Sequence, residues 1–331
     1  MRRSAEYFSG KQSLRYLTAK MRDQSGPFFA YSTLFHPHTP YCPPPKFIEQ
    51  VVGSANIDRL AYEIQKNMHG WVNGDYGAAS EAIKGLGLLY DAEMLYGDFL
   101  LEQAFAEWDS HGLLDETIVA ITSDHGEFLG EYGHLNHGAT VEDEIFRTPC
   151  LIYSPKSREV IPGSQIDHLT SALDLMPSLL YLTGIDEEWR SETILDGKNI
   201  FTDDLSDRHL VVDSPPLVYP ERLTKFPKVQ NKYRCFYRAI RNKKHKYIWN
   251  SSGDRRLLRY EDGFNWSVVK DMPIAENADL VERLHQAMER IYLSIDSTHV
   301  LEHYPLNIVT RGSGQDIDSR IQEQLKKLGY M

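Results

Sequence analysis

A short apolar run that ends in an Asp-His-Gly turn constrains the fold of this chain more than any other feature. Residues 118–121 are β-branched or small and uncharged, which predicts a strand buried on both faces of a sheet. Asp124, His125 and Gly126 follow directly after Ser123. Ligands of open α/β sheets bind just beyond the carboxyl ends of the strands. The sequence therefore predicts an α/β protein with a metal or acid–base pair here, although an exposed polar turn would also explain these three residues.

Composition excludes several classes of protein. The 331 residues suffice for a large core and a second, small domain. A net charge of −11 argues against broad nucleic-acid binding, which needs a basic surface. No apolar run approaches the roughly 18–20 residues of a transmembrane helix, and no apolar stretch of a signal peptide follows the first residues, so we expect a cytoplasmic protein without a membrane partner. Three widely spaced cysteines predict neither a disulfide framework nor a thiolate metal site.

The residues after the strand match a long motif. Residues 123–134 read Ser-Asp-His-Gly-Glu-Phe-Leu-Gly-Glu-Tyr-Gly-His, and they are followed by Asn136-His137-Gly138 and by Arg147-Thr148-Pro149. This stretch resembles the second metal-binding segment of the sulfatase family, which belongs to the alkaline phosphatase superfamily. The resemblance implies a sulfuric ester hydrolase in which Asp124 and His125 bind a divalent cation, usually calcium.

A second segment contributes a histidine. Residues 28–34 are an apolar run that predicts a central parallel strand, and Phe-His-Pro-His-Thr-Pro-Tyr follows at residues 35–41. Because prolines fix the backbone, the two histidines suggest a preorganised site rather than a mobile loop. By the resemblance to sulfatases, His38 contacts the sulfate ester and His36 is a neighbour. His137 stands where many family members have a sulfate-binding lysine.

Helical and strand patterns predict the rest of the larger domain. We expect helices over residues 11–23 and 78–110, strands over residues 117–122 and 147–153, and irregular structure over residues 46–78. The resemblance to sulfatases implies a further, structural helix over residues 168–185. The resemblance implies a mostly parallel sheet flanked by helices, incomplete at the N-terminus. We predict that this partial sulfatase α/β domain spans residues 1–204.

Beyond about residue 205, the sequence pattern becomes one of short strands joined by turns. Strand patterns at residues 237–241, 246–249 and 256–260 surround turn residues, and residues 278–293 form an amphipathic pattern. This resembles the small antiparallel sheet, covered by a helix, that sulfatases carry after the main domain. We predict such a subdomain over residues 205–331.

The chain departs from the family in its nucleophile. Sulfatases begin with a strand that ends in paired aspartates, followed by Cys/Ser-x-Pro-Ser-Arg, whose Cys or Ser becomes a formylglycine. Neither element occurs in the 331 residues, and Cys42 is followed by three prolines. We therefore expect a truncated site, inactive by itself. Calcium prefers about 6–8 oxygen ligands, so two side chains should bind it weakly, and His125 leaves manganese or zinc open.

Three functions remain open. The first is a sulfatase that acts on a sulfated small molecule or saccharide when a separate N-terminal fragment completes it. The second is a catalytically dead remnant that serves as a binding or scaffold protein. The third is a phosphatase or phosphonate-ester hydrolase of the same superfamily. An unpaired, apolar sheet edge would favour association with such a fragment or self-association.

Overall fold

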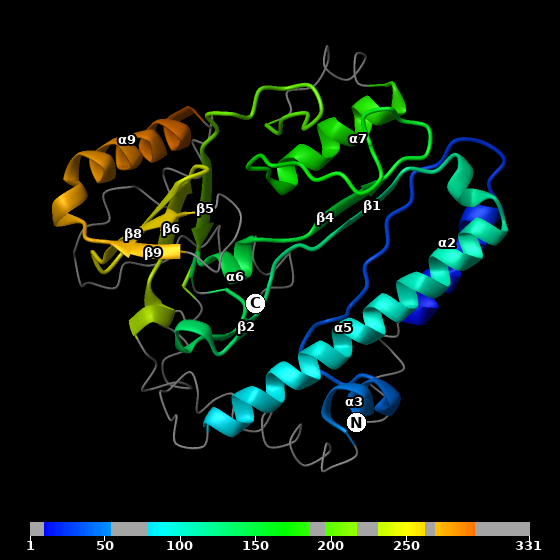
Figure 1. The fold of residues 1–331 in the computed structure, drawn as a ribbon. Helices are drawn as coiled ribbons and strands as arrows, with labels where there is room; N and C mark the ends of the chain where they lie inside the picture. The colour runs from blue at the N-terminus through cyan, green and yellow to red at the C-terminus, as the bar shows by residue number, and fades with distance from the viewer. Residues whose placement is uncertain are drawn as a thin grey trace, which may run out of the picture.

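The structure, a computed structural model, describes residues 10–53, 79–138, 140–185, 196–216, 231–261 and 269–294, with the side chains of 79–82 and 292–294 set aside. A long helix crosses one side of the molecule, and a five-stranded sheet with its own helix forms the other (Figure 1). A pair of strands lies between these two parts. No helix within the described ranges combines the length and the apolar character needed to cross a membrane.

Three helices form the first part. Helix α2 (Gly10–Arg22) packs along α5 (Ala79–Ser110), burying Leu14 and Met21 against Leu100 and Trp108. The indole nitrogen of Trp108 also donates a hydrogen bond of 2.8 Å to the hydroxyl of a buried threonine on α2. Helix α5 ends at Ser110, and Gly112 follows with a φ of 68°, a left-handed conformation that suits glycine. Both predicted helices are confirmed.

Helix α3 (Pro45–Val52) corrects the expectation of irregular structure after residue 46. Proline is favoured in the first helical turn because its missing N–H has no partner there in any case. Phe47 and Ile48 are buried against Leu86 and Leu89 of α5, so packing of one apolar face stabilises this short helix. The remainder of the stretch that was expected to be irregular, residues 54–78, lies outside the described residues.

The α/β class is confirmed, but the described strands between the two parts do not form a parallel sheet. Strand β1 (Val119–Thr122) pairs antiparallel with β4 (Cys150–Tyr153), so that Val119 lies opposite Tyr153. The side chains of β1 are half-buried, and Thr122 is exposed, so full burial on both faces was a wrong expectation. The strand itself, and the strand predicted at residues 147–153, are confirmed.

The expected central strand at residues 28–34 is wrong. These residues form no strand, and the side chains of Phe29 and Tyr31 are 85% and 80% exposed. A strand needs a neighbour that pairs its backbone N–H and C=O groups, and this segment has no ladder partner within the described ranges. A βαβ crossover through α5 is therefore absent from the described residues as well.

The loop after β1 contains its own small elements. Strands β2 (Phe128–Leu129) and β3 (Leu135–Asn136) pair antiparallel within it. Helix α6 (Asp143–Phe146) follows and leads into β4. Helix α7 (Leu175–Thr183) confirms a helix within the range expected over residues 168–185. A capping box between Ser171 and Asp174 begins the short 3-10 helix (Ala172–Asp174) that leads into α7.

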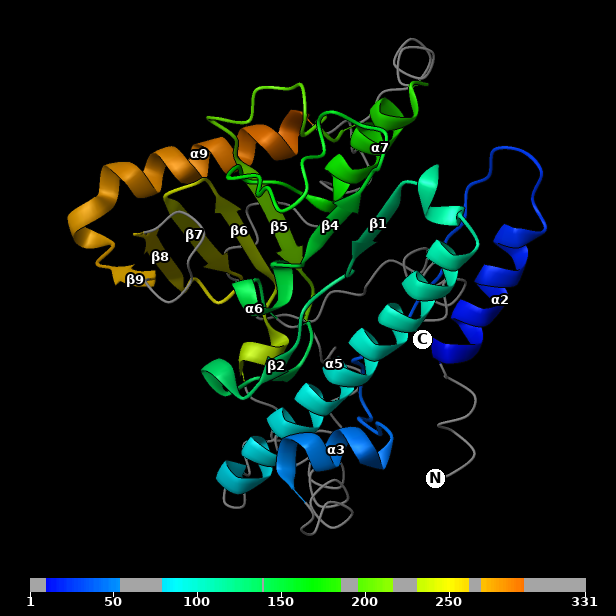
Figure 2. The same ribbon diagram turned by 45° about the vertical axis from the view of Figure 1, so that its right-hand side comes forward.

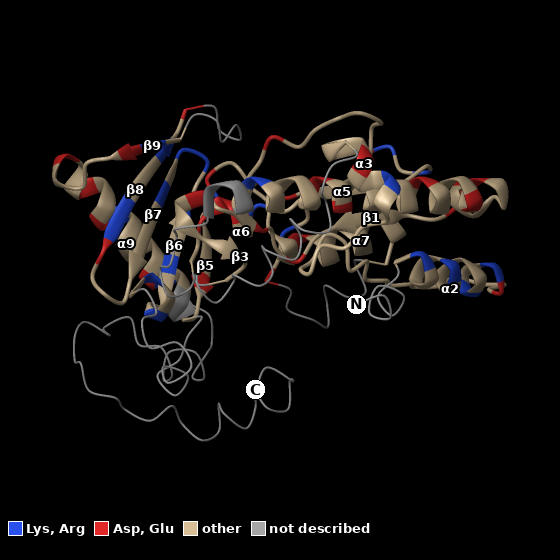
Figure 3. Ribbon diagram, turned by 90° about the horizontal axis from the view of Figure 1, so that it is seen from below, with Lys and Arg blue, Asp and Glu red and all other residues tan. Residues whose placement is uncertain are grey.

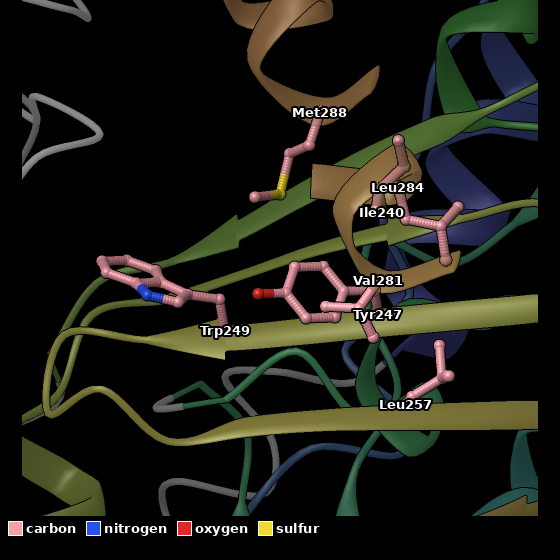
Figure 4. Packing of buried hydrophobic residues seen from close by; sticks show 7 residues of the cluster. All are labelled: Ile240, Tyr247, Trp249, Leu257, Val281, Leu284 and Met288. Atoms are coloured by element: carbon pink, nitrogen blue, oxygen red, sulfur yellow. The ribbon is translucent and has the colours of Figure 1, made fainter. Parts of the chain in front are cut away.

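The five-stranded sheet is antiparallel throughout, in the order β5-β6-β7-β8-β9. Its strands are β5 (Leu210–Ser214), β6 (Tyr237–Arg241), β7 (His245–Asn250), β8 (Arg255–Tyr260) and β9 (Val269–Met272). Helix α9 (Ala278–Ser294) lies along one face (Figure 2). Figure 4 shows the apolar cluster between them, which comprises Ile240, Tyr247, Trp249, Leu257, Val281, Leu284 and Met288. The predicted antiparallel sheet and covering helix are confirmed.

Candidate functional site

Three histidine rings and a carboxylate gather beyond the carboxyl end of β1. The ring centroids of His125 and His137 are 4.1 Å apart, and those of His137 and His38 are 5.4 Å apart. Oδ2 of Asp124 lies 3.8 Å from Nε2 of His125. The structure thus brings together all four residues that the sequence singled out, although His38 arrives on a loop rather than at the end of a strand.

Each of the three histidines uses Nδ1 for a local hydrogen bond. Nδ1 of His125 lies 2.8 Å from the carbonyl oxygen of Gly126, and Nδ1 of His38 lies 2.5 Å from that of Thr39. A carbonyl oxygen only accepts, so both rings carry a proton on Nδ1. Each therefore keeps the lone pair of Nε2 for a metal ion or for a donor on a ligand.

His137 is oriented by a buried carboxylate that the sequence analysis missed. Its Nδ1 lies 3.1 Å from Oε1 of Glu127, whose side chain is only 5% exposed. The hydroxyl of buried Tyr41 donates to the other carboxylate oxygen at 3.0 Å. The hydrogen bond that His137 donates to Glu127 raises the pKa of His137 in spite of its partial burial, which stabilises the imidazolium form relative to that of a free histidine. The only signal in the sequence was a glutamate directly after the Asp-His-Gly turn.

Asp124 is the most accessible member of the group. Its side chain is 88% exposed, and Oδ1 accepts a hydrogen bond of 3.0 Å from the backbone N–H of His125. An exposed carboxylate next to an imidazole Nε2 offers two donor atoms on the same side of one turn. A cation can approach this pair without displacing a buried group.

A hydrogen bond between the side chains of His36 and Glu93 holds the segment that carries His38. Nδ1 of His36 lies 2.5 Å from Oε2 of Glu93 on α5, and Oε1 of Glu93 accepts a hydrogen bond of 2.6 Å from the backbone N–H of Cys42. The ring of His36 packs edge-on against Tyr96 rather than on the three-histidine group. Glu93 thus ties α5 to the segment of residues 36–42.

Besides the bond from Tyr41 to Glu127, a second hydrogen bond joins the two segments of the site directly. The hydroxyl of Thr39 donates to Oδ1 of Asn136 at 3.2 Å. Asn136 has a φ of 63°, a left-handed conformation that asparagine tolerates better than most residues. His38 and His137 each lie one residue from this link, so it fixes the spacing of their rings.

The donor set fits part of a divalent-cation site. Within the described ranges, no three or more His, Cys, Asp or Glu side chains are grouped so as to hold a metal ion. Asp124 and His125 supply one oxygen and one nitrogen donor, which suit two positions around a divalent cation. They do not meet the preference of calcium for about 6–8 oxygen ligands by themselves.

Comparison with known proteins gives a consistent family match. A family model described as Sulfatase matches residues 9–185, more than half of the chain. An uncharacterized sulfatase, YidJ, of Escherichia coli (strain K12) is 36% identical over 86 residues, which cover 26% of this chain and 16% of that protein. An ulvan-active sulfatase of Formosa agariphila is 27% identical over 251 residues, covering 72% of this chain and 42% of its own length. The chain thus spans less than half of either relative.

Solved structures share the fold. The phosphonate monoester hydrolase of Agrobacterium radiobacter superposes with a TM-score of 0.60 at 19% identity, over 85% of this chain and 59% of that chain. At this identity the likeness concerns the fold, which is that of the sulfatase and alkaline-phosphatase-like enzymes.

Proposed function

Because the chain belongs to the sulfatase family, we propose that its described residues form the cation- and ester-binding side of a site for sulfuric ester hydrolysis. The observation that carries this proposal is the convergence of Asp124 with three histidines that each have Nδ1 occupied by a local hydrogen bond. The substrate class is a sulfated small molecule or saccharide.

In this proposal Asp124 and His125 hold the divalent cation, and His38 and His137 bind the ester. The cation would supply Lewis-acid polarisation of an ester oxygen. Protonated His137, favoured by Glu127, donates a hydrogen bond from Nε2 to an anionic ester oxygen. The ring of His38 faces the same group, where its Nε2 can donate a hydrogen bond to an ester oxygen when that nitrogen carries a proton. Calcium is the cation that the family resemblance implies, and the nitrogen donor of His125 makes manganese or zinc the alternatives.

We also propose that hydrolysis needs a nucleophile from outside these 331 residues. None of them reproduces the Cys/Ser-x-Pro-Ser-Arg motif, and acid–base help alone gives only about 10²–10⁴-fold acceleration. Enzymes usually reach about 10⁶–10¹⁷-fold. A polypeptide that supplies the motif and the paired aspartates would complete the site, and exposed Phe29 and Tyr31 offer it apolar contact. We propose the boundary between the two domains of this chain at residues 204 and 205.

The test is turnover of 4-nitrophenyl sulfate by the purified chain, alone and after co-expression with a fragment that carries the paired aspartates and the formylglycine precursor. We expect no turnover by the chain alone, and turnover with the fragment that His38→Ala lowers at least roughly tenfold. His111→Ala, at the exposed end of α5, is the matched control. Turnover by the unassisted chain that is lost on His38→Ala would contradict the missing nucleophile.

A phosphonate ester is the second candidate substrate class. Its tetrahedral, anionic group carries oxygens that resemble those of a sulfate ester. The arrangement of His38 and His137 therefore suits either ester. An aryl phosphonate ester assayed in parallel distinguishes the two, since the preferred ester gives the larger kcat/KM. Cation binding without turnover of either ester, even with the fragment, would instead support a binding or scaffold protein.

A further inference from the structure

The turn that carries Asp124 and His125 rests directly on α6. The backbone N–H of Gly126 donates a hydrogen bond of 2.7 Å to the carbonyl oxygen of Ile145. A Cβ atom placed on Gly126 would lie 1.9 Å from the carbonyl oxygen of Glu144. The position of α6 therefore determines where this turn can lie.

Helix α6 is in turn held by charges on the five-stranded sheet. The carboxylate of Asp143, its first residue, accepts hydrogen bonds from Nζ of Lys246 at 2.5 Å, from a guanidinium nitrogen of Arg241 at 3.0 Å and from the hydroxyl of Tyr260 at 2.7 Å. Figure 3 shows Lys and Arg segments on β6, β7 and β8. Burial raises the pKa of Asp143, but the two cations outweigh it and hold the pKa below its ordinary value.

Neighbouring residues strengthen the same attachment. Glu142 accepts a hydrogen bond of 2.5 Å from Arg256 on β8. Val141 is fully buried against Ala239, Ile248 and Leu258, on the face of the sheet that α9 does not cover. Apolar packing and three cations therefore fix residues 141–143 on this face.

The other end of the loop is also attached to residues beyond 230. Nζ of Lys232 donates to the carbonyl oxygens of Tyr132 and Gly133, and the hydroxyl of Tyr233 donates to that of Gly133 at 3.3 Å. The loop that contains His137 is thus held on both sides by the part of the chain that follows β5. The position of the turn of Asp124 and His125 therefore depends on residues beyond 230. The described residues there contribute no side chain to the group of His38, His125 and His137.

We propose that Asp143 is a positioning residue, which couples the five-stranded sheet to the turn of Asp124 and His125 through the Ile145–Gly126 hydrogen bond. Its role toward a cation rests on the proposed function, whereas its role in holding the turn does not. Loss of the carboxylate leaves Lys246, 2% exposed, as a buried charge with one partner fewer. Breaking one side of a buried pair is strongly unfavourable, so α6 should move away from the sheet.

The test is amide hydrogen exchange of Gly126 measured by NMR in two variants. Tyr260→Phe removes one donor to Asp143 and keeps both cations, and Asp143→Asn removes the charge. We expect Gly126 to exchange faster by on the order of tenfold or more in Asp143→Asn and by less in Tyr260→Phe, while amides in the middle of α5 keep their protection.

Two controls match these substitutions. Tyr247→Phe removes a hydroxyl from the same sheet on the face toward α9, where it is buried without a hydrogen-bond partner among the described residues. Asp174→Asn breaks a buried ion pair with Arg208, with contacts of 2.5 and 2.7 Å, that does not touch the loop. Neither should accelerate exchange at Gly126 beyond the change at α5.

An unchanged exchange rate of the Gly126 amide in the folded variants overturns the proposal. If Asp143→Asn does not fold, the exchange rate in Tyr260→Phe is the test. Manganese titration of the same proteins separates this result from the proposed function. Faster exchange in a protein whose wild type binds no manganese leaves the positioning role intact and contradicts the cation site. Manganese affinity that falls together with faster exchange supports both.

Discussion

At the scale of single residues, the absence of a side chain at Gly126 matters as much as the presence of those beside it. The carbonyl oxygen of Glu144 in α6 occupies the space that a Cβ would need. Gly87, in the interior of α5, offers a contrast because a Cβ there would meet nothing within 4 Å in the described part of the chain. At position 126 glycine is required because a side chain has no space. At position 87 a side chain has space, so only the backbone freedom of glycine distinguishes it from alanine there.

Gly126→Ala should therefore destabilise the protein by about 1–3 kcal/mol, as overpacking against backbone does. Gly87→Ala should stabilise it by about 0.5–1 kcal/mol, the difference in helix propensity between the two residues. Urea unfolding of both variants measures the two changes. Similar free energies of unfolding for the two variants would show that the turn does not depend on α6.

His134 gives the stability of the loop a pH dependence. Its ring is 6% exposed and stacks on Phe128, and burial followed by the charge of Lys232 lowers the pKa of His134 to about 4. The unfolded chain protonates this histidine near pH 6.5, so it binds more protons than the folded state below that pH. Stability is then complete above pH 6.5 and falls as the pH drops toward 4, by roughly 3 kcal/mol at about 1.4 kcal/mol per pKa unit.

His134→Phe should flatten this dependence, because phenylalanine keeps the stacking without a titrating group. Urea midpoints measured from pH 7 to pH 4 for the wild type and the variant test this. An equally steep loss of stability in His134→Phe would place the responsible group elsewhere.

At the scale of helices and strands, local pattern predicted those elements whose partners are near in sequence or whose faces are apolar. Helices α2 and α5 and the hairpins of the five-stranded sheet follow from periodicity and turn residues. Residues 28–34 have the composition of a strand but no neighbour within the described ranges to pair with. Propensity alone does not form a strand without a partner.

The expectation of irregular structure over residues 46–78 overlooked helix α3. Proline at the start of a helix is a favourable signal, and Phe47, Ile48, Val51 and Val52 fall at helical spacing on one face. These two signals together would have identified it.

The members of the candidate site could be named from the sequence, but their supports could not. Asp124, His125, His137 and His38 lie in recognisable motifs. Glu127 and Asp143 act through contacts with Tyr41 and Lys246, which are 86 and 103 residues away along the chain. Periodicity and local motifs carry no information about such pairings.

The packing of α9 allows a direct test at this scale. Met288 is fully buried between this helix and the sheet (Figure 4). Met288→Ala should lower the free energy of unfolding by about 2–5 kcal/mol, through lost burial and the cavity left behind. Met176→Ala on α7, where the side chain is 53% exposed, should change it by less than about 0.5 kcal/mol. Equal effects in urea unfolding would show that α9 does not contribute to the core.

At the scale of the whole molecule, one face of the five-stranded sheet packs in the apolar core of its own subdomain, and the other face supports the candidate site. Helix α9 covers the first, and residues 141–143 attach to the second. The sheet therefore stabilises a loop whose exposed Asp124 and partly exposed histidines could not hold their arrangement by themselves. A rigid support of this kind is what a site built on loops requires.

The central claim is that Asp124, His125, His137 and His38 form one cation- and ester-binding group. Titration with Mn²⁺, followed by paramagnetic broadening of the histidine ring resonances, tests it most directly. We predict that the rings of His125 and His137 broaden first and that of His38 next, while those of His245 on β7 and His285 on α9 stay sharp, and that Asp124→Ala abolishes the effect. Broadening centred on other histidines, or unchanged broadening in Asp124→Ala, would contradict the claim.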